Sequence, residues 1–144
     1  MDIHSFWDFA LAAEKEYSDY RKQIMQRFDL SAVETDVLLF LANNPGFDTA
    51  AQIAKVRRIP KSQVSVAVRS LCDRALLVWS YQPGNRKSVH LALTKQAAPV
   101  IAYGRATQEA FGEALFAGFS DAEKAEFVRL HNKIAANIAA KPRE

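Results

Sequence analysis

The chain has 144 residues, of which 49% are apolar, and it contains only five glycines and five prolines. This composition is typical of one folded domain, and no apolar run approaches the roughly 20 residues of a membrane-spanning helix. The formal net charge of +3 by itself points to no class of partner. We therefore expect a single globular domain over residues 1–144 that does not bind a membrane.

The N-terminal stretch and the cysteine content indicate a compartment. Residues 1–17 lack the basic flank and the small-residue cleavage site of a secretory signal. A single cysteine, Cys72, cannot form an internal disulfide. We expect a cytoplasmic protein.

Basic side chains gather in the middle of the chain. Residues 55–95 carry nine basic side chains and one acidic one, whereas residues 1–54 have a net charge of −5 and residues 96–144 are neutral. A charged segment is more often a solvated face than a binding site, but so sharp a segregation favours a polyanionic partner.

Capping motifs mark the starts of three helices. Ser31, Thr49 and Ser120 each precede a Glu or Gln by three residues, a spacing at which the two side chains satisfy free N–H groups of the first helical turn. Apolar periodicity adds an amphipathic first helix and two further helices. The predicted helices cover residues 5–27, 32–43, 50–56, 61–74, 95–117 and 121–140.

The segment 59–77 fits two structures. Val64, Val66 and Val68 alternate as in a half-buried strand, but a helical period explains more positions. With a helical period, one side of the helix carries an apolar stripe of Val64, Ala67, Val68, Leu71 and Ala75. Pro60 suits the first turn of such a helix because its missing N–H has no partner there.

In this helix Val66 lies on the polar face, near Ser62, Ser65 and Arg69. An apolar side chain there can contact the methyl group of thymine while its polar neighbours reach base edges and phosphates in a major groove. A single exposed valine is also common without any function. The predicted elements on either side of this helix distinguish a DNA-contacting Val66 from an exposed valine without function.

Those neighbours predict a helix-turn-helix followed by a hairpin. A short basic turn joins the helix at 50–56 to the helix at 61–74, the spacing of a motif whose second helix enters the groove. Residues 76–93 then alternate as two strands, with Pro83, Gly84 and Asn85 at the turn. Counting from this turn pairs Leu91 with Val78 and Leu93 with Leu76, and places Arg86 and Lys87 at the tip, where they suit a minor groove.

This order of elements resembles the winged helix-turn-helix transcription regulators of the MarR (multiple antibiotic resistance regulator) type. The wing carries the most specific part of the resemblance, in Ala75-Leu76-Leu77, Asn85-Arg86-Lys87 and Leu93-Thr94. The resemblance implies a mainly α fold with a small β wing, a DNA-binding core over residues 30–94 and dimerisation helices over 1–29 and 95–144. The predicted DNA-binding residues are Lys61, Ser62, Gln63, Ser65, Val66, Arg69, Arg86 and Lys87.

Four positions depart from the family pattern. Asn85 replaces an aspartate that orients the wing arginine, and Trp79 stands where the family often has a strand arginine. Ala75 and Ala97 replace glycines. Pro99 falls inside the helix predicted from residue 95, so that helix is kinked or starts late.

The terminal helices and the aromatic residues carry the remaining expectations. Phe127, Leu130, Ile134 and Ile138 recur at helical spacing, and the resemblance implies that such stripes pack between two chains of a homodimer. It also implies a small, often aromatic effector bound between the wing domain and these helices. The candidate effector residues, which would otherwise be core, are Trp7, Tyr17, Tyr20, Phe40, Tyr103 and Phe111.

We therefore predict a sequence-specific double-stranded DNA-binding transcriptional regulator, a homodimeric ligand-responsive repressor, and not an enzyme. Scattered histidines, no glycine-rich phosphate loop and no cysteine pair give no reason to expect catalytic residues, a metal or a cofactor. A metal site built from distant residues and a redox-sensing Cys72 stay open as alternatives. The alternative function is a winged-helix protein-interaction module, with Trp79 and Tyr81 as its anchors.

Overall fold

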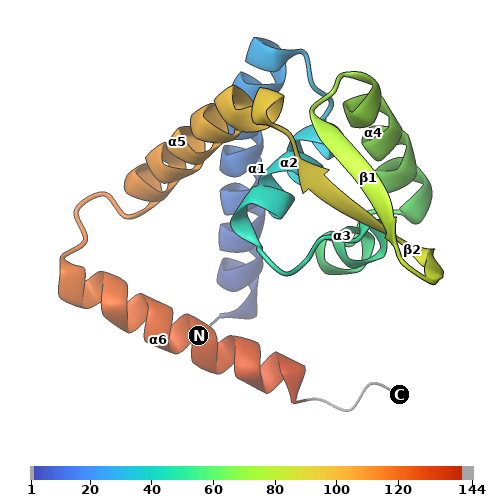
Figure 1. The fold of residues 1–144 in the computed structure, drawn as a ribbon. Helices are drawn as coiled ribbons and strands as arrows, with labels where there is room; N and C mark the ends of the chain where they lie inside the picture. Colours follow the sequence, from blue (N-terminus) through green and yellow to red (C-terminus); the bar gives the residue numbers. More distant parts are fainter. Residues whose placement is uncertain (1, 141–144) are drawn as a thin grey trace. The chain divides into compact units, whose positions relative to one another are not determined.

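The structure, a computed structural model, describes residues 2–140 (Figure 1). Within this range, helices and one antiparallel hairpin follow in the predicted order, so the mainly α fold with a β wing is confirmed. The elements are α1 Ile3–Phe28, α2 Ala32–Asn43, α3 Ala50–Arg57, α4 Lys61–Asp73, β1 Leu77–Gln82, β2 Asn85–Leu93, η1 Lys95–Ala97, α5 Ala98–Leu115 and α6 Asp121–Ala139. None of these helices is long and apolar enough to cross a bilayer.

The chain divides into two compact units, one ending at Phe111 and the other starting at Gly112. The first unit holds the core, whose fully buried side chains include Ile24, Leu38, Ile53, Leu71 and Leu77. The second unit holds the end of α5 and all of α6. No residue of α6 is buried.

Helix α2 lies at the centre of the first unit. It begins with the predicted capping box, in which Ser31 and Glu34 each accept from the other's backbone N–H at 3.1 and 2.7 Å. Every residue from Glu34 to Phe40 is buried. Helix α5 comes close at Gly104, where a Cβ would collide with the side chain of Leu39, so this crossing depends on the absence of a side chain.

Helices α3 and α4 form the predicted helix-turn-helix. Thr49 caps α3 with Gln52, and α3 ends where Arg58 takes a left-handed conformation. Pro60 precedes α4 rather than opening it, and its carbonyl accepts from the N–H of Gln63 and Val64. The helical interpretation of this segment is confirmed, because Val64, Ala67, Val68 and Leu71 are buried, but Ala75 lies beyond the helix end and is exposed.

The predicted strand register is wrong by one residue. Leu93 pairs with Leu77 and Leu91 with Trp79, so Leu77 is the buried strand residue and Val78 is exposed. The turn is Pro83-Gly84, because Gln82 pairs with Asn85, and residues 86–88 then bulge out of β2 before Val89 pairs with Tyr81. This bulge shifts every pair behind it.

The base of the hairpin is fastened to the segment before α3. The N–H of Leu91 donates to the carbonyl of Asp48 at 2.7 Å, and Thr49 bridges to His90. The His90 ring nitrogen Nδ1 also lies 3.0 Å from a carboxylate oxygen of Asp48. The hairpin therefore projects from a fixed base beside α3 and α4 (Figure 1).

Helix α5 starts late, which is one of the two outcomes expected from Pro99. A 3-10 turn covers Lys95–Ala97, and α5 begins at Ala98. Pro99 thus falls in the first turn, where a missing N–H removes no helical hydrogen bond.

Candidate nucleic-acid interface

Helix α4 presents a polar face to solvent. Its underside is held in the core by Val64, Ala67, Val68 and Leu71, so the opposite face is fixed outward. Val66 is 69% exposed on that face. The predicted residues on α4 that share this exposure are Lys61, Ser62, Gln63, Ser65, Val66 and Arg69.

Ser65 has a restricted hydrogen-bonding role. Its hydroxyl donates to the carbonyl of Lys61 at 2.9 Å, one turn earlier in the helix. Because the hydroxyl proton is engaged there, the oxygen lone pairs are what Ser65 offers to a ligand. Ser65 can therefore accept a hydrogen bond from an amino group on a base edge.

A groove runs between α4 and the start of α2. It has a volume of about 440 Å³ and contains Ser62, Gln63 and Val66 on one side and Val33 and Glu34 on the other. Sequence reasoning missed the α2 side. No local signal was available, because α2 meets α4 only through tertiary packing.

The hairpin tip carries the two predicted wing cations. Gly84 has a φ of +77°, which allows the tight turn after Pro83. The side-chain oxygen of Asn85 accepts from the N–H of Lys87 at 3.0 Å, so Asn85 organises the turn backbone. Arg86 and Lys87 lie in the bulge and are exposed.

The basic segment serves two purposes. Among the described residues, Lys61, Arg69, Arg86 and Lys87 form no ion pair with a carboxylate. Arg74 instead donates to the carbonyls of Phe28 and Asp29, both at 2.7 Å, where α1 ends. Part of the positive charge therefore stabilises the fold, and another part, these four cations, faces solvent on α4 and at the wing tip.

The predicted effector residues do not form one cluster. Tyr17 and Tyr20 pack edge-on against Phe111, with ring centroids 5.3 and 5.5 Å apart. Tyr103 packs against Phe28 at 5.7 Å and Phe40 against Phe47 at 6.2 Å. Trp7 is exposed near the start of α1. The structure thus brings Tyr17, Tyr20 and Phe111 together but separates them from Trp7.

Tyr17 and Phe40 line one cavity with polar residues that sequence reasoning missed. This cavity has a volume of about 240 Å³ and also contains Asp36, Arg57 and Gln108. A second cavity of about 440 Å³, lined by residues of α1 and by Arg57, shares Tyr17 with it. The Tyr17 hydroxyl accepts from the side-chain nitrogen of Gln108 at 3.0 Å.

A buried carboxylate binds two arginines beside these cavities. Asp36 lies 2.8 Å from Arg21 and 3.9 Å from Arg57. The Nε atom of Arg21 is buried and has no hydrogen-bond partner among the described residues. These three residues come from three different helices, and no local spacing in the sequence joins them.

Cys72 is half-buried on α4. Burial raises the pKa of its thiol, and the neighbouring charge of Asp73 raises it further. A redox sensor needs the opposite shift, because the thiolate is the reactive form.

The fold and this surface define a winged helix-turn-helix protein. Residues 28–84, which contain α2, α3, α4, β1 and the hairpin turn, match the sequence model of the MarR family. The matched part of the chain, which is less than half of its length, is therefore similar to the MarR family.

Solved structures that are named as MarR-family proteins have a similar fold. A MarR-family regulator from Listeria monocytogenes in complex with a 26mer DNA matches with a TM-score of 0.79 and 17% identity, over 96% of this chain and 97% of that one. A MarR-family regulator from Silicibacter pomeroyi matches with a TM-score of 0.78 and 19% identity, over 94% of this chain and 90% of that one. A MarR protein from Staphylococcus aureus in complex with salicylate and kanamycin matches with a TM-score of 0.77 and 15% identity, over 96% of this chain and 93% of that one. No curated protein matches the sequence.

Proposed function

We propose that the protein is a sequence-specific double-stranded DNA-binding transcriptional regulator, a homodimeric repressor that responds to a small ligand. One observation carries the proposal. The exposed face of α4 and the wing tip display Lys61, Arg69, Arg86 and Lys87 without a carboxylate partner among the described residues. Such a surface is suited to the phosphates of a duplex.

Base recognition is assigned to the outer face of α4. Gln63 can bind adenine through two hydrogen bonds, Ser65 can accept from a base amino group, and Val66 can contact the thymine methyl. Each good bidentate contact contributes about 1–3 kcal/mol of discrimination. Arg86 at the wing tip enters a minor groove, whose negative potential attracts an arginine. The structure of the Listeria protein in complex with a 26mer DNA supports duplex binding by this fold.

Exposed apolar stripes support a homodimer. Helix α6 exposes Leu130, Ile134 and Ile138, and the first part of α1 separately exposes Trp7 and Phe9. Soluble monomers rarely leave such contiguous apolar faces in water. A second copy of the chain would cover these stripes and form a two-fold symmetric dimer. The two α4 helices of this dimer would then bind two half-sites about 34 Å apart, which is one turn of the duplex.

The ligand is expected at the cavity beside Tyr17 and Arg57. The contact of Arg57 with Asp36 is long, at 3.9 Å, so Arg57 can pair with an acidic group of a small aromatic molecule. Arg57 is the last residue of α3, and α3 packs against α4. A ligand that binds more tightly to one position of Arg57 than to another therefore favours one position of α3, and with it one position of α4. The salicylate complex of the Staphylococcus protein supports this ligand class.

Selection of a duplex tests the proposal. The purified protein is used to enrich sequences from a random-sequence duplex library, and the dissociation constant of the enriched duplex is measured by fluorescence anisotropy at several salt concentrations. We expect nanomolar affinity for the enriched duplex and a steep fall of the association constant with salt. Weak binding that is equal for all sequences would favour the protein-interaction module instead.

A further inference from the structure

We propose that Trp79 and Tyr81 form an aromatic ledge that packs against the deoxyribose edge of the bound duplex, between the contacts of α4 and those of the wing tip. The inference rests on the proposed DNA-binding function. It assigns the ledge to sequence-independent DNA contact rather than to the capture of a protein.

The two rings lie on one face of the hairpin. Trp79 and Tyr81 are two residues apart on β1, so their side chains point to the same side of the sheet, and their ring centroids lie 5.4 Å apart, edge to face. Leu77 shares this row and is fully buried. Along β1 these three side chains therefore run from the core at Leu77 to the exposed surface near the hairpin tip at Tyr81.

The β2 half of this face is covered, whereas the β1 half is open. Leu91, the partner of Trp79 across the hairpin, is buried, and Val89, the partner of Tyr81, is half-buried. Trp79 itself is 55% exposed and Tyr81 is 43% exposed. Large aromatic side chains at the outer edge of a strand that the described part of the chain leaves exposed are available to a ligand.

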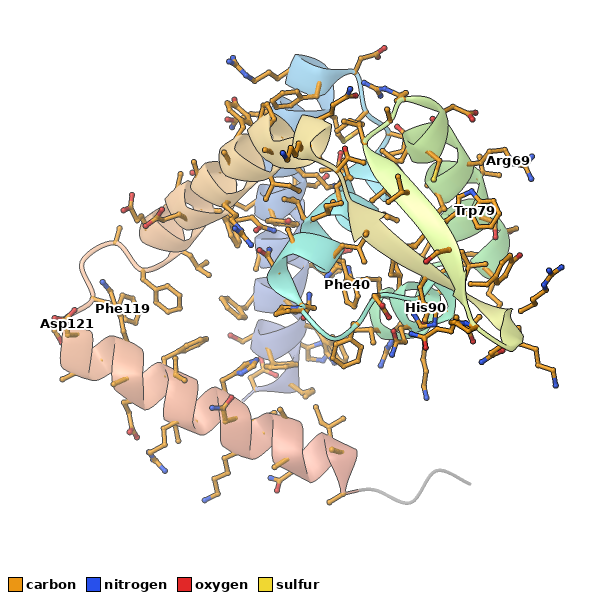
Figure 2. The ribbon with its side chains drawn as sticks, viewed as in Figure 1. Phe40, Arg69, Trp79, His90, Phe119 and Asp121 are labelled. Atoms are coloured by element: carbon orange, nitrogen blue, oxygen red, sulfur yellow. The ribbon has the colours of Figure 1, made fainter. Side chains whose placement is uncertain are left out.

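The ledge lies inside the cationic surface. Helix α4, which carries Arg69, packs against β1, and Trp79 and Arg69 lie on the same side of the molecule (Figure 2). In the other direction, Tyr81 is next to the turn that leads to Arg86 and Lys87. A duplex that contacts both sets of cations therefore passes over the two rings.

Size and charge favour DNA over a protein partner. Two aromatic side chains that are about half exposed offer roughly 200 Å², whereas a stable protein interface needs about 800 Å² from each partner. The flanking cations attract the phosphates on both sides of a sugar. Sugar C–H groups are the apolar surface that a duplex exposes between those phosphates.

Such a contact has a thermodynamic signature that separates it from the cations. A ring that packs on a sugar displaces no condensed counterion, so it contributes affinity without salt dependence. An arginine or lysine that binds a phosphate contributes both affinity and salt dependence. The slope of the association constant against salt concentration therefore distinguishes the ledge from its charged neighbours.

The first test observes Trp79 directly in the wild-type sequence. Protein labelled with fluorotryptophan gives fluorine NMR resonances for its tryptophans, and Trp79→Phe identifies that of Trp79. We expect the duplex enriched from the random library to shield this resonance from relaxation by a soluble gadolinium chelate. A resonance that stays equally accessible in the DNA complex would overturn the inference.

The second test compares variants at several salt concentrations. We expect Trp79→Ala to weaken binding of the enriched duplex about tenfold with an unchanged salt slope, and Trp79→Arg to recover affinity with a slope steeper by about one per protomer. Val78→Ala is the matched control, because Val78 is 56% exposed on the opposite face of the same strand, and it should leave affinity unchanged. Equal losses for Val78→Ala and Trp79→Ala would indicate a hairpin defect and contradict the ledge.

The outcomes also separate this inference from the proposed function. If no duplex is enriched and binding is insensitive to salt, both are wrong. If the enriched duplex binds tightly but neither shields Trp79 nor depends on it, only the ledge is wrong, and the open aromatic surface in the DNA complex would then fit a protein partner.

Discussion

Ala75 holds a backbone conformation that side-chain-bearing residues rarely adopt. Its φ is +58°, and it follows the last turn of α4, where its N–H donates to Cys72 and that of Leu76 donates to Leu71, both at 2.9 Å. These two bonds form a Schellman ending, a motif in which glycine is usual at this position. An L-residue there is strained by about 1–2 kcal/mol.

Replacement of Ala75 by glycine should therefore stabilise the protein. We expect Ala75→Gly to raise the free energy of unfolding by about 1 kcal/mol, because relief of the strain exceeds the added entropy of the unfolded chain. Denaturant unfolding of both proteins measures the change. Ala102→Gly, on an exposed position inside α5, is the control and should lower stability by about 1 kcal/mol. A destabilised Ala75→Gly variant would contradict the assignment.

Arg74 contributes to folding rather than to DNA binding. Its two bonds to carbonyls at the end of α1 satisfy acceptors that the helix leaves free and oppose the negative end of its dipole. We expect Arg74→Ala to lower the free energy of unfolding by about 1 kcal/mol while the salt slope of DNA binding stays unchanged. Arg74→Lys, which keeps the charge but loses the fork, should recover only part of the stability. A reduced salt slope in Arg74→Ala would instead place this side chain on a phosphate.

Glu34 makes stability depend on pH. Burial opposes the ionisation of its carboxyl, but hydrogen bonds from Ser70 and Ser31 and the charge of Arg74 outweigh burial and hold its pKa below the ordinary value of 4.5. A lowered folded-state pKa stabilises the protein above pH 4.5, and this contribution is lost as the pH falls through the folded-state pKa.

The comparison with Glu34→Gln isolates this contribution. Glutamine keeps the capping geometry but has no charge, so the stability advantage of the wild type should be constant near neutral pH and shrink below pH 4.5. Unfolding of both proteins in urea between neutral pH and pH 3 provides the measurement. An advantage that stays constant down to the acid limit would show that Glu34 is not held in its charged form.

At the scale of elements, the wing is the part whose geometry matters most. Its base is fixed by the bonds of β2 to Asp48 and Thr49, while the bulge at residues 86–88 turns Arg86 and Lys87 outward at the tip. A rigid base with an exposed cationic end would allow the hairpin to reach a groove beside the one proposed for α4.

Loss of the tip arginine should weaken DNA binding without affecting folding. We expect Arg86→Ala to reduce the affinity for the enriched duplex by about 1 kcal/mol or more and to lower the salt slope by about one per protomer. Lys124→Ala removes the same charge from α6 and should change neither value. An unchanged dissociation constant at fixed salt would reject the wing assignment.

At the scale of the whole molecule, the proposed regulator requires two chains. The apolar stripe on α6 is exposed along its length, and a single recognition helix reads too few bases to specify one site in a genome. We expect Leu130→Glu to convert a dimer into a monomer in light-scattering measurements at micromolar concentration, and to weaken DNA binding. Asn132→Glu adds the same charge on the opposite side of α6 and should leave the mass unchanged. A wild-type protein of monomeric mass would contradict the dimer.

Local signals in the sequence were sufficient for the helices and for the face of α4. Capping boxes at Ser31, Thr49 and Ser120 fixed three helix starts, because a cap is formed by residues three positions apart. The helical period put Val64 inside and Val66 outside. The register of the hairpin was not predictable in the same way, since the bulge at residues 86–88 shifts the pairing without a marker in the strand pattern.

The order of the elements, the helical faces and the cationic wing tip were thus determined by the sequence itself, through contacts between residues only a few positions apart. The roles of Arg74 and Asp36 and the exposure of Trp79 were decided only in the tertiary structure. Arg74 meets the last residue of α1 across 46 residues, and Asp36 meets Arg21 across 15. Trp79 is 55% exposed because, among residues 2–140, no other element covers its half of the hairpin. The packing of segments that are distant in the sequence determines which charged side chains are paired and which aromatic rings are exposed to solvent. Local spacing in the sequence does not contain this information.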